Sequence, residues 1–321
     1  MNLTLSPYIS LFYERKIRKI KKCNLLLCIA IAITWLLSPQ PALSTTLKWY
    51  NAGWAPDMQR YQNQILSLIL DYSIEPYGKY NIEYLQRDIP GERSLLELSE
   101  GRNIHIEMTT IPIRDKTLVA NVDQIKMPIY QNILGLRKLI IRKGERKKFA
   151  NIRNGDDFRH FRAGQGKDWP DVKILQSGGI KVVESIGYTR LYPMLEKRRF
   201  DYIPLSIVEV ESALNDIGEI KNQFTIVPDI YIFYPIPVYL NASKRINMLP
   251  QRIRYGLRKL IESGSLQRLF SKKFSHITKT IGANAKVFIL KNGSISTAEN
   301  TESAAQALNL YFPRNTQVFE L

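Results

Sequence analysis

The side chains that most often carry out covalent or metal-dependent chemistry are few in this sequence and lie far apart. Both cysteines, Cys23 and Cys28, fall within residues 1–44, so the rest of the chain contains neither a thiol nucleophile nor a disulfide. The three histidines stand at positions 105, 160 and 276, and none has a second ligand at the spacing of a zinc or iron site. No Gly-x-Ser-x-Gly nucleophile turn is present. The sequence therefore predicts a protein that is not an enzyme and that has no catalytic residue, metal or cofactor.

One glycine-rich stretch, Gly164-Gln-Gly-Lys167, is similar to the end of a phosphate-binding loop. That motif needs a Ser or Thr directly after its lysine and a glycine at the start of the loop. Asp168 and Phe161 occupy these two places, so the match fails.

The N-terminal residues have the pattern of an export signal. A basic stretch at 15–22 precedes an apolar stretch at 25–37, and the small residues Ala42 and Ser44 follow. The apolar stretch is shorter than the roughly 20 residues that a membrane-spanning helix needs, so we expect cleavage after Ser44 and a periplasmic location. The leader is unusually long, which leaves open a start codon placed too early or retention of the leader as an anchor.

The formal net charge is +17, and residues 45–321 retain +12 because six basic residues and one acidic residue precede them. A basic surface can attract nucleic acid or acidic lipid. An exported protein rarely meets nucleic acid, so we expect no nucleic-acid partner and interpret the surplus as a solvated basic surface.

Apolar periodicity divides residues 47–274 into strands and helices. The predicted strands are 47–53, 80–85, 104–111, 132–142, 161–163 and 202–205. The predicted helices are 59–74, 94–100, one starting at 156–158, 188–198, and two within 249–274 that break at Gly264. Strands that alternate with helices predict an α/β fold with mostly parallel sheets.

The last residues have a weaker pattern. Residues 294–303 are polar and predict a loop, and 304–310 predict a short final helix. The pattern leaves open whether this tail packs on the first half of the protein or reaches a partner.

Four stretches resemble the family 3 solute-binding proteins, the capture components of amino-acid uptake transporters. In chain order they are Gly53-Trp-Ala-Pro-Asp57, Thr109-Thr-Ile-Pro-Ile-Arg-Asp-Lys116, Ala163-Gly-Gln-Gly-Lys-Asp-Trp169 and Glu196-Lys-Arg-Arg-Phe-Asp-Tyr202. Each motif alone is weak, and the resemblance rests on their order and spacing over residues 47–275. It implies the two-lobed type II periplasmic-binding-protein fold, in which two crossing segments form a hinge.

The resemblance implies ligand contacts from the first lobe. Trp54 stands where the family has an aromatic wall of the cleft. Arg114 occupies the place of an arginine that grips the ligand's carboxylate, and its planar fork of donors suits that role. Thr109 would add a hydroxyl, whereas Ile111 replaces a threonine that normally donates.

The resemblance also implies contacts from a glycine-rich turn of the second lobe. Gly164, Gln165 and Lys167 stand where the family's backbone N–H groups and hydroxyls meet the ligand's carboxylate. Glycines let a backbone approach an anion closely. Gln165 and Lys167 replace the hydroxyls, which favours an acidic ligand or a different contact.

Ser206 is the candidate that departs most from the family. Amino-acid binders carry an aspartate there that pairs with the ligand's ammonium group. A buried ammonium group without a carboxylate partner is costly. A standard α-amino acid is therefore not expected as ligand unless Glu209 or Glu211 reaches the site.

These inferences predict a signal peptide at 1–44, a first lobe at 45–130 and 236–275, a second lobe at 131–235, and a C-terminal extension at 276–321. The predicted function is capture of a small carboxylate-bearing solute between the lobes for an ABC-type uptake system. The expected partners are that solute and a membrane permease or receptor, and the protein is expected to be a monomer. Two alternatives stay open: a ligand-sensing module for a membrane receptor or signalling enzyme, and an enzyme that uses cleft carboxylates for dehydration or glycan cleavage.

Overall fold

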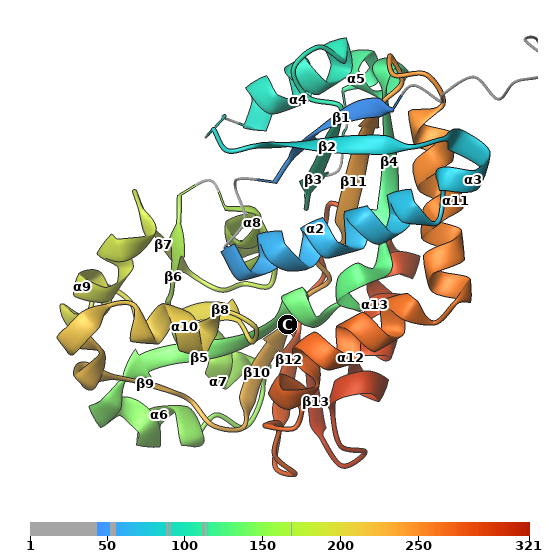
Figure 1. Cartoon of the computed structure of the whole chain (residues 1–321). Coiled ribbons are helices and arrows are strands. Elements are labelled where there is room, and N and C mark those ends of the chain that lie inside the picture. Colours follow the sequence, from blue (N-terminus) through green and yellow to red (C-terminus); the bar gives the residue numbers. More distant parts are fainter. Residues whose placement is uncertain are drawn as a thin grey trace, which may run out of the picture. The chain divides into compact units, whose positions relative to one another are not determined.

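Two large β-sheets, each covered by helices, and one small two-stranded sheet organise the described part of the chain (Figure 1). A computed structural model describes residues 44–321 apart from 52–55, 88, 90, 111, 112, 114 and 168, and the side chains of 91, 92 and 278 are also outside the description. Residues Thr46–Leu321 form one unit. The predicted signal peptide lies outside the described residues except for Ser44. In the described part of the chain, no helix is both long and apolar enough to cross a membrane.

The first sheet has the strand order β2-β1-β3-β11-β4. Its strands are β1 (Thr45–Tyr50), β2 (Tyr80–Leu85), β3 (Ile106–Thr109), β4 (Val122–Met127) and β11 (Val238–Ser243). Successive side chains of a strand point to opposite faces, so Trp49 packs with helices α2 (Pro56–Asp71) and α11 (Leu249–Glu262), whereas Tyr50 packs with α4 (Gly91–Glu100). We call this sheet with its helices the first lobe.

The second sheet has the order β13-β12-β10-β5-β8, with β9 also paired to β5. Its strands are β5 (Leu136–Arg142), β8 (Ile203–Ser206), β9 (Phe224–Ile226), β10 (Ile230–Phe233), β12 (Lys286–Ile289) and β13 (Gln317–Glu320). Strands β6 (Ala163–Gly166) and β7 (Val182–Ser185) form a small parallel sheet that a bridge between Ala163 and Tyr202 connects to the beginning of β8. We call these sheets with their helices the second lobe.

Shorter elements connect the strands. The other α-helices are α3 (Ile74–Tyr77), α5 (Lys116–Asn121), α6 (Arg146–Ala150), α7 (Gly155–Arg159), α8 (Pro170–Ser177), α9 (Leu191–Glu196), α10 (Val210–Asn215), α12 (Ser265–Thr278) and α13 (Thr297–Tyr311). The 3-10 helices are η1 (Pro128–Tyr130), η2 (Ile133–Gly135), η3 (Lys143–Glu145), η4 (Tyr188–Arg190) and η5 (Gly218–Gln223).

Two segments carry the chain between the sheets, 128–135 from β4 to β5 and 234–237 from β10 to β11. They touch where Gly135 accepts a hydrogen bond from the Tyr234 N–H at 3.2 Å. A Cβ at position 135 would lie 2.0 Å from the Tyr234 carbonyl oxygen, so only glycine permits this approach. The predicted lobe boundaries at 131 and 236 fall in these segments, and bending of the segments as a hinge stays a prediction.

The expected α/β class is present, but the expectation of mostly parallel sheets is wrong. Strand β11 is antiparallel to β3 and β4, and β5 is antiparallel to β8, β9 and β10. Parallel neighbours need a helical crossover that returns the chain to the same end of its sheet. Strands β5 and β11 each follow a direct crossing between lobes instead, and both enter their sheets in the opposite direction.

The tail is more ordered than its pattern predicts. The expected loop at 294–303 is wrong beyond position 296, because α13 starts at Thr297 and continues to Tyr311. Ser296 accepts from the Glu299 N–H, and the Glu299 carboxylate accepts from the Ser296 N–H, which is a capping box. Strands β12 and β13 extend the second sheet, and the buried Tyr311 and Phe312 join a core cluster that includes residues of the first lobe.

Helices α2 and α11 approach each other closely at Gly256. A Cβ there would lie 1.9 Å from the Ile69 carbonyl oxygen, so Gly256→Ala must push the helices apart. We expect the free energy of unfolding to fall by about 1–3 kcal/mol or more, measured by thermal or denaturant unfolding. Gly144→Ala is the matched control because open space surrounds position 144. Equal stability of the two variants would contradict this packing.

Candidate functional site

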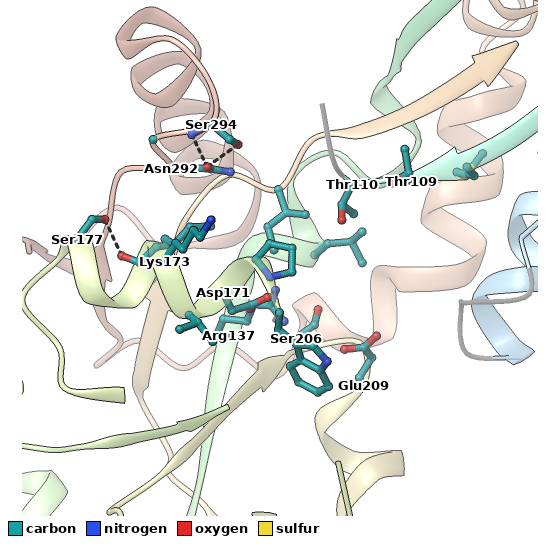
Figure 2. Close-up of a pocket in the computed structure, with 18 of the residues that line it drawn as sticks. Thr109, Thr110, Arg137, Asp171, Lys173, Ser177, Ser206, Glu209, Asn292 and Ser294 are labelled. Atoms are coloured by element: carbon teal, nitrogen blue, oxygen red, sulfur yellow. Dashed lines mark hydrogen bonds and ion pairs between the residues drawn. The ribbon is translucent and has the colours of Figure 1, made fainter. Parts of the chain in front are cut away.

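A cavity of about 1230 Å³ lies between the two sheets and is lined from both lobes (Figure 2). The first lobe contributes Tyr50, Asn51, Ser94, Glu107, Thr109 and Thr110. The second lobe contributes Arg137, Ser206, Glu209, Glu184 and residues 169–174, 176 and 177, and the tail contributes 292–294. Its volume exceeds the roughly 300–1,000 Å³ of typical small-molecule sites.

The ends of strands place several of these side chains. Asn51 follows β1, Thr110 follows β3, and Ser206 ends β8. Open α/β sheets bind ligands beyond the carboxyl ends of their strands. Arg137 enters from the beginning of β5, which its antiparallel direction brings to the same edge as the end of β8.

A buried ion pair between Arg137 and Asp171 lines this cavity. The Arg137 guanidinium contacts the Asp171 carboxylate at 2.8 Å (Nη2 to Oδ1) and lies 5.1 Å from the centre of the Tyr234 ring. The Tyr234 hydroxyl donates to the same Asp171 oxygen at 2.5 Å. Burial raises the pKa of Tyr234 well above its usual value, so this hydroxyl keeps its proton. The positive charge of Arg137 is thus already balanced within the protein.

Ser206 and Glu209 face the cavity close to each other (Figure 2). Ser206 is 2% exposed, and its hydroxyl has no hydrogen-bond partner among the described residues. Glu209 begins the turn into α10, and its N–H donates to the Ser206 carbonyl at 2.9 Å. Burial raises the pKa of the Glu209 carboxyl, while Arg137 opposes the shift and Asp171 adds to it. Both groups are desolvated polar groups that a bound molecule could satisfy.

Glu107 is a second buried carboxyl at the cavity, on the first lobe. It is 7% exposed and accepts one hydrogen bond, from the Ser94 hydroxyl at 2.6 Å. Burial raises the pKa of Glu107 to about 7, and the Ser94 hydrogen bond opposes this shift. Glu107 is therefore partly protonated near neutral pH.

Of the seven predicted ligand residues, the structure brings Thr109 and Ser206 to the cavity. Trp54 and Arg114 lie outside the described residues. Whether any of the four touches a solute stays a prediction.

The other three predicted residues are not among the described residues that line the cavity. Gly164 is buried against the Phe200 ring, where a Cβ would come within 2.2 Å of a ring carbon. Gln165 is buried and donates to the Pro204 carbonyl at 3.2 Å. Lys167 is exposed. The geometry gives Gly164 and Gln165 a structural role, and ligand contact by any of the three stays a prediction.

The sequence interpretation overlooked Glu107, Arg137, Asp171 and Trp169, all of which line the cavity. Only Glu107 had a sequence pattern that could have marked it as a candidate, because it is an acid between the buried Ile106 and Met108 of a predicted strand. Of the two acids either of which would allow an amino-acid ligand, Glu209 reaches the cavity. Glu211 is exposed and is not among the described lining residues.

No protein-family model matches this sequence, and no curated protein matches it. A Bacillus subtilis structure described as a "probable amino-acid ABC transporter extracellular-binding protein" gives a TM-score of 0.50 at 15% identity, over 73% of this chain and 98% of that one. The unliganded, open L-cystine solute receptor of Neisseria gonorrhoeae gives 0.44 at 16% identity, over 72% and 92%. At 15% identity, the first of these similarities establishes the fold alone. The chain has the type II periplasmic-binding-protein fold. The two-lobed fold that the sequence resemblance implied is thereby confirmed.

The Arg137–Asp171 pair generates a prediction about stability. Asp171→Asn leaves the buried guanidinium without its counter-charge, so we expect the free energy of unfolding to fall by about 3–5 kcal/mol in denaturant titrations. Asp156→Asn is the matched control, since Asp156 pairs with Arg159 at the surface and should cost at most about 1 kcal/mol. Similar losses in both variants would show that the buried pair contributes no more to the free energy of unfolding than a surface pair does.

Glu107 generates a prediction about pH. The unfolded chain releases this proton near pH 4.5 and the folded chain near pH 7, so the folded state binds more protons between these values. Ionisation of Glu107 should lower the free energy of unfolding by up to about 3 kcal/mol as the pH rises through this window. Glu107→Gln should remove this pH-dependent loss of stability. Glu83 is an exposed acid on the same sheet, so Glu83→Gln should show the same loss as the wild type. Parallel stability profiles for the wild type and Glu107→Gln would contradict the burial of this charge.

Proposed function

We propose that this chain is an exported solute-binding protein that captures a small solute, carrying a carboxylate and an amine, between its lobes for an ABC-type uptake system. The observation that carries the proposal is the pair Ser206 and Glu209. Ser206 is buried and Glu209 half-buried at a cavity that both lobes line, the Ser206 hydroxyl has no hydrogen-bond partner among the described residues, and Glu209 forms no ion pair there. Leaving such groups unsatisfied costs free energy, and a solute between the lobes can recover it.

The amine end of the solute is assigned to Glu209. A desolvated carboxylate is a suitable partner for an ammonium group. Ser206, three positions before Glu209, stands where amino-acid binders have an aspartate for this role. The Ser206 hydroxyl can accept a second hydrogen bond from the same ammonium group. This pair replaces the missing aspartate and makes an amino-acid-like solute acceptable.

The carboxylate end is assigned to Arg114, on the resemblance of its segment to the family. Thr109 and Thr110, which precede it, line the cavity and support this placement. Arg137 is less suited to the role because Asp171 already balances it at 2.8 Å. Contacts from both lobes would favour the closed state, which a membrane permease could distinguish from the open state.

The test uses the full chain expressed with its own leader and purified from the periplasmic fraction. Thermal-shift and calorimetric titrations with amino acids, organic acids and amines should identify a ligand that adds about 2.7 kcal/mol of stability at a hundred times its Kd. Glu209→Gln should weaken binding of that ligand at least about tenfold, and Arg114→Ala should abolish the thermal shift. Glu211→Gln, on the exposed side of α10, is the control and should bind as the wild type does.

Binding that is equally strong in Glu209→Gln and Arg114→Ala would refute the assignment of the two ends. Absence of any shift across the three ligand classes would refute solute capture and favour the sensing alternative. Chemical turnover of a bound compound would instead identify the enzyme alternative.

A further inference from the structure

The described residues that line the cavity carry more acidic than basic groups, although the chain is strongly basic. The formal net charge of the chain is +17, but the described lining contains Glu107, Asp171, Glu184 and Glu209 against only Arg137 and Lys173. Arg137 is balanced by Asp171 at 2.8 Å, and Lys173 is exposed on α8. Neither cation therefore neutralises Glu107 or Glu209 by an ion pair.

Glu107 and Glu209 approach the cavity from different lobes. Glu107 lies on β3 and pairs in register with Tyr50 of β1 and Asn241 of β11, whereas Glu209 follows β8 of the second sheet. Both carboxyls line this one cavity. The Ser206 hydroxyl, 2% exposed and without a partner among the described residues, is an independent sign that the cavity is built for a polar ligand.

The surroundings of Glu107 contain no counter-charge in the described part of the chain. Ser94 of α4 supplies its one hydrogen bond, at 2.6 Å. Arg93, also on α4, pairs instead with Glu97 at 3.1 Å. The Tyr50 hydroxyl donates to the Ile89 carbonyl at 3.1 Å, and Asn241 is neutral and accepts from Gln124 at 2.9 Å.

We propose that Glu107 forms a second cation subsite, so that the captured solute carries two separate cationic nitrogen groups, one at Glu209 with Ser206 and one at Glu107. The class of solute is a basic amino acid. This proposal rests on the proposed function and adds to it the charge of the solute. The raised pKa of Glu107 is consistent with a carboxyl whose counter-charge arrives with the ligand.

The experiment compares L-lysine with L-norleucine, which has the same chain length and lacks the distal nitrogen, and adds 1,5-diaminopentane as a third probe. Calorimetric titrations use the periplasmic full-chain product at pH 8. We expect lysine to bind at least about tenfold more tightly than norleucine in the wild-type protein. This ratio should fall toward one in Glu107→Gln and persist in Glu83→Gln, the exposed control on β2.

A pH series gives a second readout that needs no variant. Lysine needs the ionised Glu107, so its advantage over norleucine should shrink as the pH falls from 8 to 6 and Glu107 takes up its proton. This series decides the question alone if Glu107→Gln does not fold.

Three results would overturn the proposal. Norleucine that binds as tightly as lysine refutes the second subsite and leaves the proposed function standing. A lysine preference that persists in a folded Glu107→Gln, or that is constant with pH, assigns the distal nitrogen to another group. Failure of all three probes refutes the dibasic class, and the broader ligand screen then decides whether solute capture itself survives.

Discussion

The buried ion pair between Arg137 and Asp171 is the interaction on which the geometry of the site depends. It joins the beginning of β5 to the first turn of α8, and the Tyr234 hydroxyl adds the end of β10 to the same cluster. Three segments far apart in the sequence therefore meet at one charge pair. Because an unpaired charge in the interior is very costly, these segments cannot separate while the protein stays folded.

The crossing segments add a steric constraint to this electrostatic one. Gly135 packs against the Tyr234 backbone so closely that no side chain fits between the two crossings. The C-terminal tail also contacts the first crossing segment and the strand that precedes it. The Tyr311 hydroxyl donates to the Gln131 carbonyl at 2.6 Å, and Glu299 of α13 pairs with Lys126 of β4 at 2.9 Å. The tail thus contacts the first lobe and the crossing through α13 and joins the second sheet through β12 and β13.

Other polar groups at the cavity contrast with the paired charges of Arg137 and Asp171. Asp171 has two partners, whereas the hydroxyl of Ser206 and the carboxyls of Glu107 and Glu209 have one described side-chain partner between them. Desolvated polar groups reduce stability, and they are retained where a ligand can satisfy them. These unsatisfied groups at the cavity, with the Arg137 Nε among them, support a site that binds a solute rather than one that only closes a core.

The sequence by itself determined the elements that local periodicity encodes. The helix break at Gly264 separates α11 from α12 as predicted, because glycine there has a φ of +68° that other residues rarely adopt. The strand at 80–85 also has its predicted bounds. Ser296 and Glu299 have the spacing of a capping box and indicate the start of α13. The polar residues of this helix, however, led to the wrong prediction of a loop. Only the tertiary structure decided the direction of the strands. Direction depends on whether the chain enters a strand from a helix of the same lobe or from a crossing between the lobes. The tertiary structure also decided that Glu209 and not Glu211 lines the cavity, since the turn after β8 sets which side chain faces inward.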